Sequence, residues 1–215
     1  MKNDPKSNIQ REVAAKSSGT RQRIVAAAID EFARHGIDGA RVDRIAKSAR
    51  VNKAMIYYHF DSKDRLYLEV VTSFYKNIRQ RAEETVLPSE TLEEALTALV
   101  SVHELMFTGN EYIRPMMLRE LADPRPEVLE TVAAIFSSAG IPQKIIALLD
   151  EGMRGGKYRR TDIRQALVAF ASMSLYYHFS AQFINRLLNI DDPRRFAAER
   201  PRAIVDVFLN GLKAR

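Results

Sequence analysis

Apolar residues recur every three or four positions along most of the chain, which is the spacing of one face of an α-helix. One such stripe follows Thr20, a candidate N-cap, and predicts a helix over about residues 21–35 that Gly36 ends. A longer stripe predicts a helix over about residues 63–86, before Pro88. No segment alternates apolar and polar residues as a half-buried strand does. The pattern therefore predicts an all-α protein of about nine or ten helices.

Residues 41–63 are predicted to form two short helices joined by a tight turn. The first helix has one apolar face with residues spaced i, i+3, i+4 and i+7, namely Val42, Ile45, Ala46 and Ala49. Asn52 is a candidate N-cap for the second helix, which turns Ile56 and Phe60 inward. The outward residues of this second helix are Lys53, Ala54, Met55, Tyr57 and Tyr58.

This outward face suits the major groove of DNA. Lysine and tyrosine hydroxyl groups reach phosphates, while short side chains let a helix approach the base edges. An ordinary helical hairpin with exposed tyrosines explains the pattern equally well when the pattern is taken alone.

The segment from about Thr20 to Val71 resembles the N-terminal domain of the TetR family of bacterial transcriptional regulators. The matching residues follow one another in order and spacing: Ile24, Ala27, Ala28, Phe32, Gly36, Gly39, Ile45, Ala46, Ala49, Val51, Ile56–Phe60, Ser62, Lys63 and Leu66. Two positions depart from the family pattern. Arg50 stands where the family usually has glycine at a left-handed helix end, at a cost of about 1 kcal/mol. Val42 stands where the family often has a hydroxyl group that bonds a phosphate.

The resemblance implies which residues contact DNA. Those expected to hold phosphates are Lys53, Tyr57, Tyr58 and Lys63, and those expected to face base edges are Asn52, Ala54 and Met55. Arg41 and Arg44 are expected to support them from the preceding helix, where either can replace the missing hydroxyl contact.

The positive charge of the chain is concentrated at the same end. The net charge is +6, and residues 1–60 carry all of it, with twelve Lys or Arg against six Asp or Glu. This is the distribution that a polyanionic partner requires, although a chance charge bias would look the same.

The composition argues against several other functions. The chain has no cysteine, and its four histidines are not spaced as metal ligands, so no metal site or cofactor is expected. No phosphate-binding loop, nucleophile elbow or carboxylate pair indicates an enzyme. No apolar run reaches the length of a membrane span, and the N-terminus has no apolar signal core, so a cytoplasmic protein without membrane contact is predicted.

Three regions are predicted along the chain. Residues 1–18 are polar and basic and are expected to form a flexible arm, either without a role or lying along the minor groove. Residues 19–65 form the helix-turn-helix domain, and residues 66–215 form a helical domain for ligand binding and dimerisation. Small residues along 163–188 allow close helix packing, and with the last helix this segment resembles the four-helix dimer interface of the family. The alternative is a simple internal core helix.

Polar side chains interrupt or border the apolar stripes of the C-terminal region, which predicts a mostly apolar ligand pocket with a few polar groups. The residues predicted to line it are the polar His103, Tyr112, Glu120, Tyr176 and His178 and the apolar Met116. Two arrangements of Glu120 stay open. An unpaired buried Glu120 requires a cationic ligand or a neutral carboxyl group. A Glu120 that pairs with Arg114 or Arg119 instead predicts a neutral or weakly acidic hydrophobic ligand, which we prefer.

The sequence thus predicts a homodimeric DNA-binding regulator, a repressor that a small hydrophobic effector releases from an inverted-repeat operator. The alternative is a helical DNA-associating or adaptor protein with no small-molecule effector.

Overall fold

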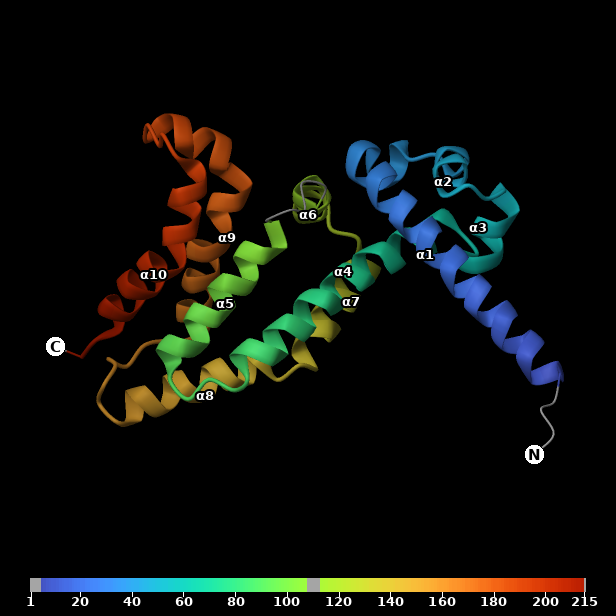
Figure 1. Ribbon diagram of the computed structural model, residues 1–215. Coiled ribbons are helices and arrows are strands. Elements are labelled where there is room, and N and C mark those ends of the chain that lie inside the picture. The colour runs from blue at the N-terminus through green and yellow to red at the C-terminus, as the bar shows by residue number, and fades with distance from the viewer. Residues whose placement is uncertain (1–4, 108–112, 215) are drawn as a thin grey trace. The chain divides into compact units, whose positions relative to one another are not determined.

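The computed structural model describes residues 5–107 and 113–214 (Figure 1). Their regular secondary structure is helical, apart from one isolated antiparallel bridge between Tyr158 and Lys213. The prediction of an all-α fold is confirmed. The helices in chain order are α1 (Pro5–Gly39), α2 (Val42–Ala49), α3 (Lys53–Phe60), α4 (Lys63–Val86), α5 (Leu92–Phe107), α6 (Ile113–Ala122), α7 (Pro126–Ser137), α8 (Ile141–Arg154), α9 (Ile163–Leu187) and α10 (Pro193–Leu212).

The first helix starts earlier than expected. We expected a flexible arm over residues 1–18, whereas α1 begins at Pro5. Proline is well tolerated in the first helical turn, and the following stretch to Lys16 contains no glycine or proline and several strong helix formers. At the other end, Gly36 has φ 65° and ψ 178°, which breaks the helix at the predicted position.

The chain divides into two compact units, and the division differs from the predicted boundary near residue 65. The first unit comprises Met1–Phe74 and Pro115–Val128, and the second comprises Tyr75–Arg114 and Leu129–Arg215. The first unit therefore includes part of α4 and most of α6. The sequence did not reveal this because the association depends on contacts between residues far apart in the chain.

The core of the first unit joins α1 to the three helices that follow it. Fully buried side chains come from α1 (Ile24, Phe32), α2 (Ile45), α3 (Ile56) and α4 (Leu66). Burying side chains of this size contributes about 1.5–3 kcal/mol each. These contacts fix α2 and α3 on a rigid support.

The second unit is built around α5, α8, α9 and α10. Leu96 of α5 and Leu149 of α8 are buried, and the rings of Phe170 (α9) and Phe208 (α10) meet edge-to-face with centroids 5.0 Å apart. In the described part of the chain no single helix has the length and apolar character to cross a membrane; only α7 and α8 together, bent by 54°, meet those two criteria.

Candidate functional site

The turn between α2 and α3 adopts the left-handed conformation that the sequence suggested. Arg50 has φ 55° and ψ 49°, and its backbone N–H donates to the carbonyl oxygens of Ala46 and Lys47 at the end of α2. The backbone N–H of Val51 donates to Ala46 over 3.0 Å. These bonds satisfy the last carbonyl groups of α2 and offset the strain of a side chain in this region.

Asn52 caps α3 as predicted. Its side-chain oxygen accepts a hydrogen bond of 2.9 Å from the backbone N–H of Met55. One lone pair of this oxygen is therefore used at the helix end in this structure, and the other lone pair and the amide nitrogen are left for a base edge. Asn52 has a structural role besides its expected contact with DNA.

The outward face of α3 is arranged as the periodicity predicted. Ile56 and Phe60 are buried, whereas Lys53 and Ala54 are exposed and Met55 is half-buried. The two tyrosines project into solvent, with 42% of Tyr57 and 77% of Tyr58 exposed. The rings of Tyr57 and Tyr58 are therefore exposed on a short helix that is packed against the core, and they are available to a partner surface.

Lys53 is held by a carboxylate that sequence reasoning missed. Its Nζ lies 3.1 Å from Oδ1 of Asp43, which projects from the first turn of α2. The hydrogen bond and negative charge of Asp43 raise the pKa of Lys53. Opposite charges on the two helices were visible in the sequence, but nothing there showed that the two side chains meet.

Glu31 of α1 ties the start of α2 in place. One of its oxygens accepts hydrogen bonds from the backbone N–H of Arg41 (2.8 Å) and from Nε of Arg44 (2.7 Å), and Nη2 of Arg44 lies 2.6 Å away. Burial acts to raise the pKa of Glu31, but these hydrogen bonds outweigh it and hold that pKa below its ordinary value. The side chain of Arg44 thus links α2 to α1. The side chain of Arg41 is exposed, and only its backbone N–H bonds to Glu31.

Lys63 also makes an internal contact. Its Nζ donates to the carbonyl oxygen of Ala40 over 3.4 Å. A lysine ammonium has three donors, so two stay available for a phosphate.

The nine predicted DNA-contacting residues all lie in the first unit. They are on α2, on α3, at the start of α4 or directly beside these helices.

Glu120 belongs to the first unit and is paired. Oε1 of Glu120 accepts a hydrogen bond of 2.7 Å from the hydroxyl of Tyr67 and forms an ion pair with Arg125. The Arg125 guanidinium also lies over the Tyr67 ring, 4.2 Å from its centroid. Burial and the hydrogen bond to Glu120 raise the pKa of Tyr67. We expected Arg114 or Arg119 as the partner, which is wrong, because Arg125 follows the break after α6 and folds back onto it.

Arg119 instead caps the break in α1. Its Nη1 donates to the carbonyl oxygens of Phe32 (3.3 Å) and Ala33 (3.0 Å). The break at Gly36 leaves these carbonyls at a helix end, and a guanidinium there also meets the negative end of the helix dipole.

His103 and His178 form a polar cluster inside the second unit. Nδ1 of His103 lies 2.7 Å from Oγ of the fully buried Ser174, and Nε2 of His178 lies 3.2 Å from Oε1 of Glu104. The His178 ring stacks on Phe107 with centroids 4.4 Å apart. Burial, together with the proximity of a second imidazole, lowers the pKa of His103 to about 4, so its imidazole is neutral at pH 7.

The described residues among the six predicted for one pocket belong to both units. His103 and His178 come together in the second unit, whereas the buried Met116 and Glu120 belong to the first unit. Tyr112 lies outside the described residues. Tyr176 is 60% exposed, because a step of two residues from His178 turns it to another side of α9. Among the described residues, no three His, Asp or Glu side chains gather as metal ligands.

The side of α9 that carries Tyr176 presents a stripe of small and apolar residues. They recur at intervals of three, four or seven along the helix and are exposed: Ala169, Ser172, Tyr176, Phe183 and Leu187. Phe183 and Leu187 each keep about three fifths of their surface exposed. A stripe with this spacing is typical of a helix that packs against another helix.

Comparisons with known proteins agree with the resemblance. Residues 24–70 match the model of the family described as bacterial regulatory proteins, tetR family. The chain is 27% identical over 210 residues to the HTH-type transcriptional repressor NicS of Pseudomonas putida, covering 93% of this chain and 95% of that protein. The structure of SCO4942 from Streptomyces coelicolor shares 27% identity and a TM-score of 0.66 over 90% of this chain and 98% of its own. FadR from Bacillus subtilis in complex with stearoyl-CoA also has a TM-score of 0.66, at 20% identity over 89% of this chain and 98% of its own.

Proposed function

Because the chain is a member of the TetR family of bacterial transcriptional regulators, we propose that it is a homodimeric repressor that a small hydrophobic effector releases from an inverted-repeat operator. The observation that carries the proposal is the face of α3, where Tyr57 and Tyr58 project into solvent above the buried anchors Ile56 and Phe60. We place this activity in the cytoplasm and regard the protein as a regulator rather than an enzyme.

DNA contact is proposed through two kinds of residue. Lys53, Tyr57, Tyr58 and Lys63 hold phosphates, which supplies affinity without sequence preference. Ala54 and Met55, near the N-terminus of α3, face the base edges and supply the preference. Lys53 must exchange Asp43 for a phosphate when DNA binds, because the two anions compete for one ammonium group.

The homodimer is proposed to form through α9 and α10. The exposed stripe on α9 supports it, as does Val207 on α10, which is 61% exposed. A two-fold dimer places its recognition helices in successive major grooves, about 34–36 Å apart. This spacing is the reason that the operator is expected to be an inverted repeat.

The effector is proposed to bind in the second unit, in the polar cluster that contains the neutral His103 and the neighbouring His178. Glu104 faces His178 there, so the proposal favours a neutral or weakly acidic hydrophobic ligand over a cation. The FadR structure holds stearoyl-CoA, which shows that this fold can accept an apolar acyl ligand. The effector displaces DNA only to the extent that it binds the DNA-free state more tightly.

The test begins with selection of binding sites from a pool of random duplex DNA by the full-length protein. An inverted repeat should be enriched, and Ala54 or Met55 variants should enrich a different sequence. A thermal-shift screen of neutral aromatics, fatty acids and hydrophobic cations then identifies ligands, and each ligand is added to the protein–operator complex. Enrichment of an operator that no stabilising ligand displaces would support the alternative, a DNA-associating protein without an effector. No enrichment would overturn the proposal.

A further inference from the structure

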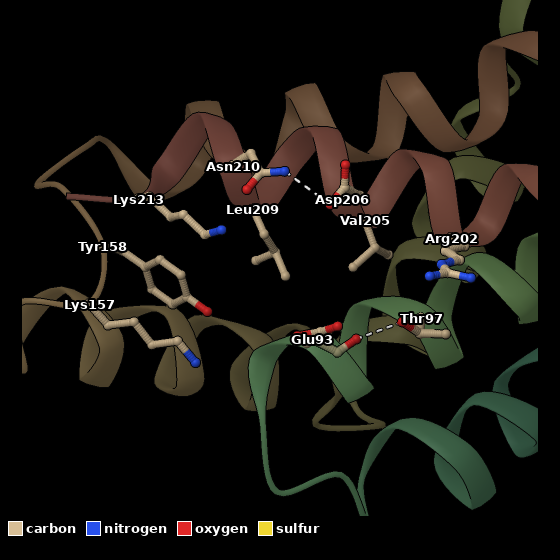
Figure 2. A pocket seen from close by; sticks show the side chains of 10 residues that line it. All are labelled: Glu93, Thr97, Lys157, Tyr158, Arg202, Val205, Asp206, Leu209, Asn210 and Lys213. Atoms are coloured by element: carbon tan, nitrogen blue, oxygen red, sulfur yellow. Dashed lines mark hydrogen bonds between the residues drawn. The ribbon is translucent and has the colours of Figure 1, made fainter. Parts of the chain in front are cut away.

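A cavity of about 610 Å³ lies in the second unit, away from the polar cluster of His103 and His178. It is lined by the first turns of α5, the segment between α8 and α9, and the C-terminal half of α10 (Figure 2). Its α5 residue Glu93 precedes His103 by ten positions, which corresponds to about 15 Å along the helix. The volume is within the usual range of small-molecule sites, about 300–1,000 Å³.

One end of this cavity is rigidly built and positively charged. The bridge between Tyr158 and Lys213 places Lys157 beside the end of α10, and the backbone N–H of Ala214 donates to the carbonyl oxygen of Lys157. The buried Tyr158 ring fits against Gly152, where an added Cβ would lie 2.3 Å from the ring. The Lys157 ammonium lies over the Tyr158 ring, 5.5 Å from its centroid, and in the view of Figure 2 Lys213 lies above this ring and Lys157 below it.

The remaining wall combines apolar and acidic side chains. Val205 and Leu209 of α10 form an apolar stretch, with Glu93 on α5 and Asp206 on α10 (Figure 2). Asp206 accepts a hydrogen bond of 3.0 Å from the side-chain amide of Asn210. Arg202 completes the charged lining.

The charged side chains that line this cavity are all exposed. Three cations and two carboxylates line it, yet within the described part of the chain none of the five forms an ion pair: Lys157, Arg202, Lys213, Glu93 and Asp206. Charged side chains of opposite sign that share one cavity without pairing are complementary to a ligand that carries both charges. The apolar wall between them fits an aliphatic spacer.

We infer that this cavity is a second ligand site, which takes an aliphatic zwitterion with a carboxylate at one end and an ammonium group at the other. The carboxylate binds Lys157, Lys213 and the Tyr158 hydroxyl, the methylene chain lies on Val205 and Leu209, and the ammonium group meets Glu93. A simple carboxylate or amine satisfies only one end. The site is independent of the proposed effector site and of DNA binding.

Isothermal titration of the full-length protein with 6-aminohexanoate, hexanoate and hexylamine tests this assignment. The zwitterion should bind about fivefold more tightly than either single-charge analogue, because each partly exposed ion pair contributes modestly. Shorter and longer ω-amino acids, 4-aminobutanoate and 8-aminooctanoate, then measure the separation of the two ends. Equal affinity for the three six-carbon probes, or no heat with any of them, would overturn the inference.

Two variants locate the ends of the ligand. Glu93→Gln should reduce the affinity for 6-aminohexanoate to that for hexanoate, and Lys213→Gln should reduce it to that for hexylamine. Glu90→Gln and Lys76→Gln are the matched controls, since these residues do not line the cavity, and they should leave the affinity unchanged. Circular dichroism verifies that each variant is folded. If Glu93→Gln and Lys213→Gln both bind the zwitterion like the wild type, the ligand lies elsewhere and the inference fails.

Discussion

The hydroxyl of Tyr67 on α4 donates a 2.7 Å hydrogen bond to Oε1 of Glu120 on α6. Arg125 reinforces the contact by pairing with the same carboxylate and lying over the Tyr67 ring. The three groups fasten residues 115–128 to the first unit and explain why that unit includes a segment so distant in the sequence. They also remove Glu120 from the set of free charges available to a ligand.

Removing the Tyr67 hydroxyl should destabilise the protein without altering the exposed face of α3. Tyr67→Phe is expected to cost about 1 kcal/mol, because one buried hydrogen bond is lost while the Glu120–Arg125 pair persists. Urea unfolding measures the change. Tyr57→Phe is the control, since that tyrosine is exposed and its loss should cost less than about 0.5 kcal/mol. Equal stabilities for Tyr67→Phe and the wild type would show that the contact contributes nothing.

DNA binding should be strongly dependent on salt. If each subunit makes three or four phosphate contacts, the logarithm of the binding constant should fall against the logarithm of salt concentration with a slope of roughly −5 to −7. Tyr57→Phe and Lys63→Ala should weaken binding to all sequences alike, whereas Lys76→Ala on the second unit should not. Fluorescence anisotropy at several salt concentrations gives both results. A slope near zero would contradict the proposed interface.

Releasing Lys53 from Asp43 should strengthen DNA binding. Asp43→Asn removes the carboxylate that competes with phosphate for the Lys53 ammonium, and we expect about two- to fivefold tighter binding at low salt. Asp38→Asn makes the same change of net charge at an exposed position of the first unit. A larger gain in DNA affinity for Asp43→Asn than for Asp38→Asn isolates the effect of the Asp43–Lys53 ion pair. Identical gains would mean that only the overall charge of the protein matters.

A charged side chain in the α9 stripe should separate the subunits. Ala169→Arg places an unpaired guanidinium within the proposed dimer interface, where its desolvation is costly. Sedimentation velocity should then show a helical monomer with reduced operator affinity. The matched control is Ala133→Arg at an exposed position of α7, which should leave the dimer intact. A wild-type monomer at micromolar concentration would contradict the proposed assembly.

His103 should make the second unit sensitive to acid. Its pKa of about 4 lies below the unfolded value of 6.5, so the unfolded chain takes up this proton more readily. The stabilisation is therefore fully present above pH 6.5 and is lost as the pH falls toward 4. The melting temperature of His103→Gln should vary less over this window than that of the wild type, while His35→Gln, which changes a more exposed histidine, should retain the wild-type dependence.

The sequence by itself determined the helices and many of their ends. The predicted range 63–86 coincides with α4, Asn52 caps α3, and Gly36 breaks α1 at the predicted position. These features are local, because helix periodicity and capping involve residues within four positions of one another. For the same reason, the buried and exposed faces of α3 followed from spacing alone.

The tertiary structure decided which charged and polar groups meet. Asp43 with Lys53, Glu31 with Arg44, and Glu120 with Arg125 are each brought together by helix packing or by a turn of the chain. Packing also turned Tyr176 outward and placed five charged side chains around one cavity of the second unit. A sequence shows that such groups exist, but the distances between them depend on how whole helices pack. That packing is governed by apolar contacts, which do not specify particular ion pairs.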